Sequence, residues 1–202
     1  MTDQVRAARE DLAFMRELAE DRGPLPSHLG QHIFWPGLLY GLNVIATWAG
    51  LAGVIPWPND WYVWAWAPAT AAYVPICLWI NLRSSKQPWG PGARMFAAAW
   101  SAVALLTLTV VTVVITASFR TGLNYAGVWP AFALGIYGAS WLVMGILLKR
   151  MWAVAVAFGC SVTAIVMSFL IDSPHMWLVM GIGLLLLLAV PGAAIMRKNK
   201  TA

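Results

Sequence analysis

The 202-residue sequence has little charge, and its charges lie away from its long apolar stretches. Only 10% of the residues are Asp, Glu, Lys or Arg, against about one quarter in an ordinary soluble domain. An ionisable side chain at bilayer depth usually marks a proton relay, an ion pathway or a voltage sensor. Because no such group lies in the middle of an apolar stretch, the sequence argues against a proton-coupled pump and a voltage-gated channel.

Cysteine and histidine are also scarce. Cys77 and Cys160 lie within apolar stretches and provide no disulfide framework. His28 and His32 are four residues apart, a spacing that can hold a metal ion on one helix face. However, His175 is expected at the opposite membrane surface, and no Cys, Asp or Glu lies close to the pair in sequence. We therefore expect no metal site and no haem or other cofactor.

Arrangements for catalysis are lacking as well. A nucleophilic Ser or Cys needs a base within hydrogen-bond reach, and the histidines and carboxylates are confined to the ends of the apolar stretches. Asp172, Ser173 and His175 are neighbours, but so short a run is more simply a turn. We expect a protein that is not an enzyme. The basic residues lie where membrane topology requires them, so they do not indicate a nucleic-acid partner.

What the sequence does contain is apolar length: 60% of its residues are hydrophobic. Six stretches are long enough, at about 1.5 Å per residue, to cross the roughly 30 Å hydrocarbon core of a lipid bilayer. They are residues 30–54, 61–82, 94–118, 126–148, 151–171 and 175–196. The sequence therefore predicts an all-α integral membrane protein, with a cytoplasmic amphipathic helix and linker over 1–26 and a six-helix transmembrane domain over 27–202.

Basic residues set the expected orientation. Twelve of the 13 Lys and Arg fall before the first span, between spans two and three, between spans four and five, or after the last span. The other side has only Arg120. Because loop Lys and Arg are retained in the cytoplasm, we expect a multi-pass protein with both termini cytoplasmic.

Before the first span, residues 2–22 have the period of an amphipathic helix. Its apolar stripe consists of Val5, Ala8, Leu12, Met15 and Ala19. The acidic and basic residues on the other faces nearly cancel, which fits a water-facing surface better than binding to anionic lipid. The stripe predicts a contact with the protein's own bundle, with a second copy in a homo-oligomer, or with a partner membrane protein.

The segment LAFMRELAEDRG, followed by a Trp-rich six-span body, resembles a group of small, uncharacterised bacterial membrane proteins. Those proteins begin with a similar AFMR-x-L-A-E helix before the first span. The resemblance covers about twelve residues and the overall plan. It implies a bacterial cytoplasmic (inner) membrane location and transfers no functional residue.

The second span contains Pro68 and Pro75, which are expected to interrupt its hydrogen bonds and to leave carbonyl groups free. One interpretation is a kinked packing helix. The other is a pocket for a lipid, a quinone or another hydrophobic ligand, since a kinked helix can open a cavity with aromatic walls. Its candidate ligand-binding residues are Trp64, Trp66, Pro68, Thr70, Tyr73 and Pro75, with Asn43 of the first span.

Two functions are therefore open. The favoured one is a non-enzymatic accessory, scaffold or sensor protein that associates with a partner protein or a hydrophobic ligand. The alternative is a small transporter of a neutral or amphipathic solute. It follows from a possible inverted 3+3 repeat, because Trp35-Pro36 with Gly41 recurs as Trp129-Pro130 with Gly135. Small-residue stripes, such as Gly37 with Gly41, are expected to pack helices together.

Overall fold

The computed structural model describes residues 5, 9–13, 15–16, 27–56, 66–84, 90–122 and 128–198. These residues form helices and turns, with no strand among them. The helices are α2 (Ser27–Leu51), α4 (Trp66–Ser84), α5 (Pro91–Thr121), α6 (Trp129–Leu147), α7 (Met151–Ser168), α8 (His175–Leu184) and α9 (Val190–Lys198). A π-helical turn, η2 (Leu185–Ala189), joins α8 to α9, and these three elements are here called the C-terminal helix. The predicted all-helical class is confirmed.

Four helical segments are long and apolar enough to cross a membrane, as judged by length and composition. They are Gly92–Thr121, Trp129–Leu147, Met151–Ser168 and His175–Arg197. The described residues thus support a multi-pass membrane protein. α2 and α4 are of comparable length, with 25 and 19 residues, but both contain Trp, Tyr and Pro, and α2 also contains Gly and His, which makes them less apolar.

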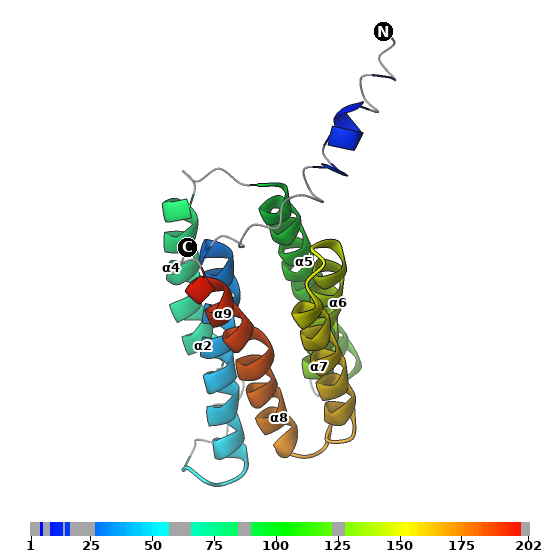
Figure 1. Cartoon of the computed structure of the whole chain (residues 1–202). Helices are drawn as coiled ribbons and strands as arrows, with labels where there is room; N and C mark the ends of the chain where they lie inside the picture. Colours follow the sequence, from blue (N-terminus) through cyan, green and yellow to red (C-terminus); the bar gives the residue numbers. More distant parts are fainter. Residues whose placement is uncertain are drawn as a thin grey trace.

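The helices form two layers of three (Figure 1). In one layer, α2 lies between α4 and the C-terminal helix. In the other layer, α6 lies between α5 and α7. Successive helices run in opposite directions, so the beginning of α2 and the end of α9 lie at the same end of the bundle.

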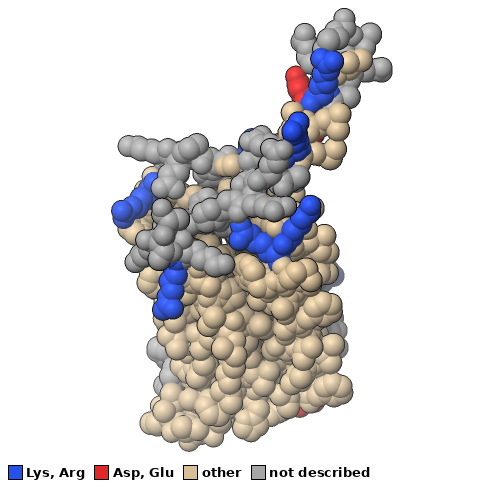
Figure 2. Space-filling model, in the orientation of Figure 1, with Lys and Arg blue, Asp and Glu red and all other residues tan. Residues whose placement is uncertain are grey.

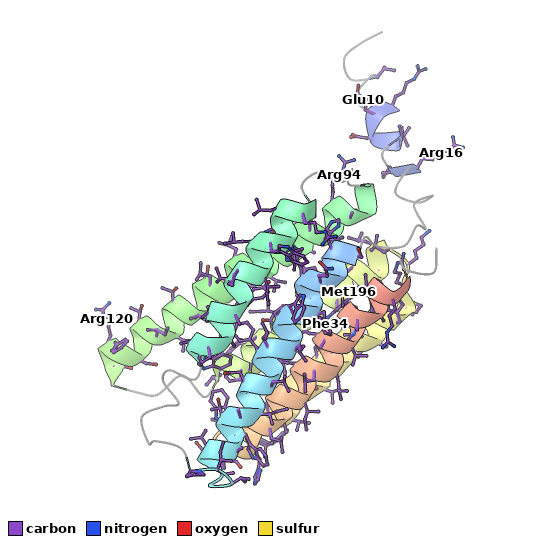
Figure 3. The ribbon with its side chains drawn as sticks, turned by 90° about the vertical axis from the view of Figure 1, so that its left-hand side faces the viewer. Glu10, Arg16, Phe34, Arg94, Arg120 and Met196 are labelled. Atoms are coloured by element: carbon purple, nitrogen blue, oxygen red, sulfur yellow. The ribbon has the colours of Figure 1, made fainter. Side chains whose placement is uncertain are left out.

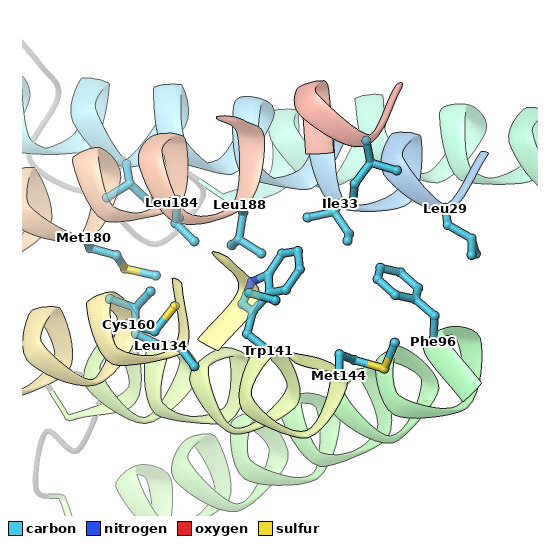
Figure 4. Close-up of a cluster of buried hydrophobic side chains, with 14 of the residues drawn as sticks. Leu29, Ile33, Phe96, Leu134, Trp141, Met144, Cys160, Met180, Leu184 and Leu188 are labelled. Atoms are coloured by element: carbon cyan, nitrogen blue, oxygen red, sulfur yellow. The ribbon is translucent and has the colours of Figure 1, made fainter. Parts of the chain in front are cut away.

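Large side chains fill the space between the two layers. Figure 4 shows Trp141 and Leu134 of α6 directed toward Leu184 and Leu188 of the C-terminal helix, with Phe96 of α5 beside Leu29 of α2. Trp141 is 1% exposed and Leu134 is completely buried. The layers therefore meet through side chains, and this seam is the core of the bundle.

Within the first layer, glycines let α2 approach the C-terminal helix closely. A Cβ atom on Gly37 would lie 2.6 Å from the backbone nitrogen of Ala189, and one on Gly192 would lie 2.8 Å from the carbonyl oxygen of Gly30. A Cβ on Gly181 would lie 3.0 Å from the carbonyl oxygen of Gly41. The small-residue stripe of the first span therefore packs helices, because only glycine permits backbones this close.

The second layer uses the same device between α6 and α7. A Cβ on Gly145 would lie 2.8 Å from the backbone nitrogen of Val154, and one on Gly138 would lie 3.1 Å from the carbonyl oxygen of Ala157. By contrast, Gly135 on another face of α6 has open space around it, with no atom within 4 Å of a Cβ. The α6–α7 pair is thus tightly packed, while the face of α6 that contains Gly135 is not.

The π-helical turn has a cause in the sequence. Pro191 has no N–H, and its ring would collide with the carbonyl oxygen four residues earlier in a regular helix. The Val190 N–H instead donates to the Leu185 oxygen, a step of five residues. The helix widens by one residue here and continues through the proline.

Positive charge gathers at one end of the bundle, here called the basic end, as Figure 2 shows. Its residues are Arg83, Arg94, Lys149, Arg150 and Arg197, which lie at helix ends or in the α6–α7 turn. In Figure 3, Arg94 lies at one end of α5 and Arg120 at the other. Arg120 is the one Lys or Arg of the described bundle that lies at the opposite end.

Candidate functional site

The predicted ligand-binding residues of the second span meet Tyr40 of α2. The Tyr40 and Thr70 hydroxyl oxygens are 3.0 Å apart. The Thr70 hydroxyl donates to the Trp66 carbonyl oxygen at 2.9 Å. Since a threonine hydroxyl has a single hydrogen, Tyr40 donates to Thr70. Trp66 and Thr70 were predicted as ligand-binding residues, a role that stays a prediction. Tyr40 was not predicted, because the pairing of α4 with α2 is a tertiary feature.

Aromatic rings surround this hydrogen bond. The Tyr40 ring centroid lies 5.9 Å from that of Trp66 and 6.2 Å from that of Tyr73. Trp66 in turn lies 6.1 Å from Trp177 of α8. These spacings are typical of favourable aromatic pairs. Tyr40, Trp66, Tyr73 and Trp177 form what is here called the α4 aromatic cluster, which joins three helices of one layer.

The other predicted residues differ in their position. Pro75 lies inside α4, and Pro68 lies two residues after Trp66, the first described residue of that helix. Trp64 lies outside the described residues. The Asn43 amide nitrogen is buried and has no hydrogen-bond partner within the described part of the chain.

A second group of rings lies across the seam on α5, α6 and α7. Trp100 stacks on Tyr137 at a centroid distance of 6.0 Å and meets Trp141 edge-on at 5.7 Å. Trp141 also lies 6.5 Å from Phe96 and 5.5 Å from Trp152. These five residues form the core aromatic cluster. The depth of Trp100 and Trp141 in their predicted spans was the only sequence signal for it.

The core aromatic cluster contains two donors without acceptors, and two more lie on α2 and α5. The indole nitrogens of Trp100 and Trp141, like the Asn43 amide, are buried with no hydrogen-bond partner among the described residues. The Thr107 hydroxyl of α5 is in the same condition. A buried polar group without a partner is uncommon and requires an explanation. Because these groups are uncharged, the seam suits water or a neutral guest with acceptor atoms.

Histidines lie near both ends of the bundle. Nδ1 of His32 is 3.9 Å from the Cys77 sulfur, which also accepts from the Asn81 amide at 3.8 Å. The Trp48 indole donates to Nδ1 of His175 at 3.3 Å, at the end opposite the basic end. Among the described residues, no three His, Cys, Asp or Glu side chains come together as a metal-binding group.

The described part of the N-terminal stripe is uncovered. Val5, Leu12 and Met15 are helical and 43%, 62% and 57% exposed. Figures 1 and 3 show that the described residues of this segment stand clear of the bundle, with Glu10 and Arg16 labelled. Ala8 and Ala19 lie outside the described residues. Packing of the described stripe on its own bundle is therefore not observed.

The geometry offers aromatic faces, hydroxyls and unpaired neutral donors, and the described residues of the seam contain no acid–base pair. No family model, curated protein or solved structure matches the chain. The function proposed below therefore depends on the chain's own residues.

Proposed function

We propose that the chain is a six-span protein of the bacterial cytoplasmic membrane that acts without catalysis, by binding a partner membrane protein through its N-terminal helix. α2 and α4 supply the two further spans. With 25 and 19 residues they extend about 37 Å and 28 Å, close to or above the hydrocarbon thickness. α2 has no Asp, Glu, Lys or Arg, and α4 has only Arg83 in its last turn.

The charge distribution supports an orientation with both termini in the cytoplasm. All the basic residues of the described bundle except Arg120 lie at the basic end. That end also holds the beginning of α2 and the end of α9. Positively charged loops are retained on the cytoplasmic side during insertion, so this end is assigned to the cytoplasm.

The exposed stripe of Val5, Leu12 and Met15 is the observation that carries the association. A helix with an uncovered apolar face gains free energy by docking that face into the groove of a partner. Two basic residues, Arg9 and Arg16, and two acidic residues, Glu10 and Asp11, lie in the same segment as the stripe, so their charges balance. This balance favours a protein surface over an anionic membrane surface.

The test is cross-linking and pull-down from native membranes, with the full chain carrying Leu12→Asp and Met15→Asp together. The matched control is Glu10→Gln on the polar side of the same helix. A carboxylate in an apolar contact loses its hydration without gaining a partner, so the double variant is expected to recover at least tenfold less partner. The control is expected to recover the wild-type amount.

Native mass spectrometry of the same samples separates the two kinds of partner. A heteromeric mass that disappears in the double variant supports the proposal, and a homodimer that disappears assigns the stripe to a second copy. If both the partner list and the copy number are unchanged, the stripe has no role in association.

One further observation favours the alternative, a small transporter. α2 and α6 are the first helices of the two proposed halves, and each is the centre of its layer. α2 pairs with α4 and the C-terminal helix, just as α6 pairs with α7 and α5. Because successive helices alternate in direction, this correspondence is the one that an inverted repeat would produce.

The two halves differ where the repeat would place equivalent glycines. A Cβ on Gly41 would lie 3.2 Å from the carbonyl oxygen of Gly181, whereas Gly135 has no neighbour within 4 Å. The glycine of α2 is thus packed against the C-terminal helix, whereas its counterpart on α6 has no neighbour.

Proteoliposome flux tests the transporter. Trp66→Ala and Tyr73→Phe alter the α4 aromatic cluster, and Trp79→Phe is the control because Trp79 is 52% exposed on the same helix. Flux of a neutral solute that falls at least tenfold only in the first two variants would favour the transporter. If the wild type gives no flux above that of empty liposomes, the transporter function is excluded.

A further inference from the structure

A groove of about 770 Å³ opens between α5 on one side and α6 and α7 on the other. Its lining is almost wholly apolar and includes Ala102 and Leu106 of α5, Gly135 and Ala139 of α6, and Ile165 of α7. In the most apolar 18-residue stretch of α5, only 6% of the residues are buried, so α5 contacts the rest of the bundle along a narrow edge. The groove therefore opens laterally, toward the space that lipid occupies around a membrane protein.

Small residues on α6 give the groove its depth. Ala131, Gly135 and Ala139 recur every four residues along its floor. A Cβ on Gly135 would meet no atom within 4 Å. A side chain added here starts in open space and extends into the groove, which makes Gly135 a suitable site for a test.

The length and the lining of the groove suit a hydrocarbon chain. Along α6 the groove extends from Val128 to Val143, about 22 Å at the helical rise. Its lining is almost wholly apolar. A hydrocarbon chain that lies along α6 therefore matches the groove in both length and polarity.

Positive charge near the end of the groove that faces the basic end indicates which kind of head group the hydrocarbon chain carries. Val143 lies six residues before Lys149, and Ala99 lies five residues after Arg94, so the groove ends about 8–9 Å from the basic end. Lys149 and Arg94 are both exposed. Basic residues at a membrane surface attract anionic lipids at about 1 kcal/mol each.

We infer that the groove binds one acyl chain of an anionic phospholipid, whose head group lies among the cations of the basic end. The inference requires that α5, α6 and α7 lie in a bilayer, as proposed above. It does not depend on a partner at the N-terminal helix, so removal of residues 2–22 is expected to leave lipid binding unchanged.

The experiment uses the full chain, reconstituted with equal amounts of phosphatidylglycerol and phosphatidylcholine that carry identical acyl chains. Lipids retained after gentle extraction are counted by native mass spectrometry. The wild type is expected to retain phosphatidylglycerol at least fivefold over phosphatidylcholine. Gly135→Leu and Ala139→Leu fill the groove, and each is expected to reduce the retained phosphatidylglycerol at least fivefold. Ala104→Leu, on an exposed part of α5 outside the groove lining, is the matched control and is expected to retain the wild-type amount.

The double variant Arg94→Gln and Lys149→Gln distinguishes the contribution of the lipid head group from that of the acyl chain. This variant is expected to retain both lipids about equally, because the groove is intact and the charge is lost. Equal retention of the two lipids by the wild type would overturn the proposed anionic lipid. Unchanged retention in Gly135→Leu and Ala139→Leu, with wild-type thermal stability, would overturn the groove. A change of copy number in these variants without loss of lipid would assign the surface to a second copy.

Discussion

The Tyr40 and Thr70 hydroxyl oxygens lie 3.0 Å apart and connect α2 to α4, two helices that share few other polar contacts among the described residues. Thr70 already donates to the Trp66 carbonyl oxygen, so it receives the hydrogen of Tyr40. The bond thus fixes the rotation of α4 with respect to α2. The same rotation brings Trp66 and Tyr73 against the Tyr40 ring.

Removing this hydrogen bond is expected to have a small, measurable effect on stability. Tyr40→Phe should lower the free energy of unfolding by about 0.6 kcal/mol, the usual size of an interhelical hydrogen bond in a membrane. A double-mutant cycle with Thr70→Val, measured by reversible unfolding in mixed micelles, should return a coupling of that size. Thr109→Val is the control, because its hydroxyl is exposed and bonds only to the Leu105 carbonyl oxygen of its own helix. A coupling near zero would show that the ring contacts alone hold α4.

Two glycine-to-alanine changes are expected to have opposite signs. Gly37→Ala places a methyl group 2.6 Å from the Ala189 backbone nitrogen, so the two helices must separate, at a cost of about 1–3 kcal/mol. Gly135→Ala meets open space, and the higher helix propensity of alanine should raise stability by up to about 1 kcal/mol. Melting temperatures in detergent, followed by circular dichroism, compare the pair. If both variants were destabilised equally, the close approach of α2 to the C-terminal helix would not contribute to stability.

The buried indole of Trp141 gives a third test. Trp141→Ala leaves a cavity in the seam and should cost about 3–5 kcal/mol through lost contacts. Trp141→Phe should cost clearly less, because it also removes an N–H that has no acceptor among the described residues. Thermal unfolding monitored by the remaining tryptophans provides the measurement. If the phenylalanine variant loses as much stability as the alanine variant, the indole nitrogen has a partner, such as an ordered water.

Orientation can be tested by labelling single cysteines with a membrane-impermeant maleimide in intact cells. Ser173→Cys lies in the turn between α7 and α8, at the end opposite the basic end, and should be labelled from outside. Lys149→Cys lies in the α6–α7 turn and should be labelled only after the membrane is opened. Cys77 and Cys160 should be replaced by alanine in both variants. Labelling of Lys149→Cys in intact cells would reverse the proposed topology.

The sequence pattern was enough to predict where the helices of the bundle lie, because the length of an apolar stretch and the proline or glycine at its end determine where a helix can form. α5, for example, begins at Pro91 after Gly90 and ends at Thr121, before Gly122 in the left-handed conformation. The α4 part of the candidate site was predicted for the same reason, since Trp66, Thr70 and Tyr73 share a helix face. Tyr40 and Trp177 were not, because the sequence does not determine which helices become neighbours.

The threonines of α5 illustrate the limit of such patterns. Thr109, Thr112 and Thr116 recur at a spacing that puts them along one face of α5 and suits packing against another helix, yet all three are exposed. The Thr109 and Thr112 hydroxyls instead donate to carbonyl oxygens of their own helix, those of Leu105 and Leu108. A threonine hydroxyl that donates to the carbonyl oxygen four residues earlier needs no partner on a neighbouring helix. The spacing of threonines along a helix therefore does not indicate a contact with another helix.

The length of α5 makes the protein sensitive to bilayer thickness. From Arg94 to Arg120 the helix extends about 39 Å, roughly 9 Å more than an average hydrocarbon core. In such a membrane α5 has to lean, or its arginines have to reach outward along the surface. In a thicker, sterol-rich or long-chain bilayer it can stand more upright, so the distance between its Arg120 end and α6 becomes a property of the surrounding lipid as well as of the chain.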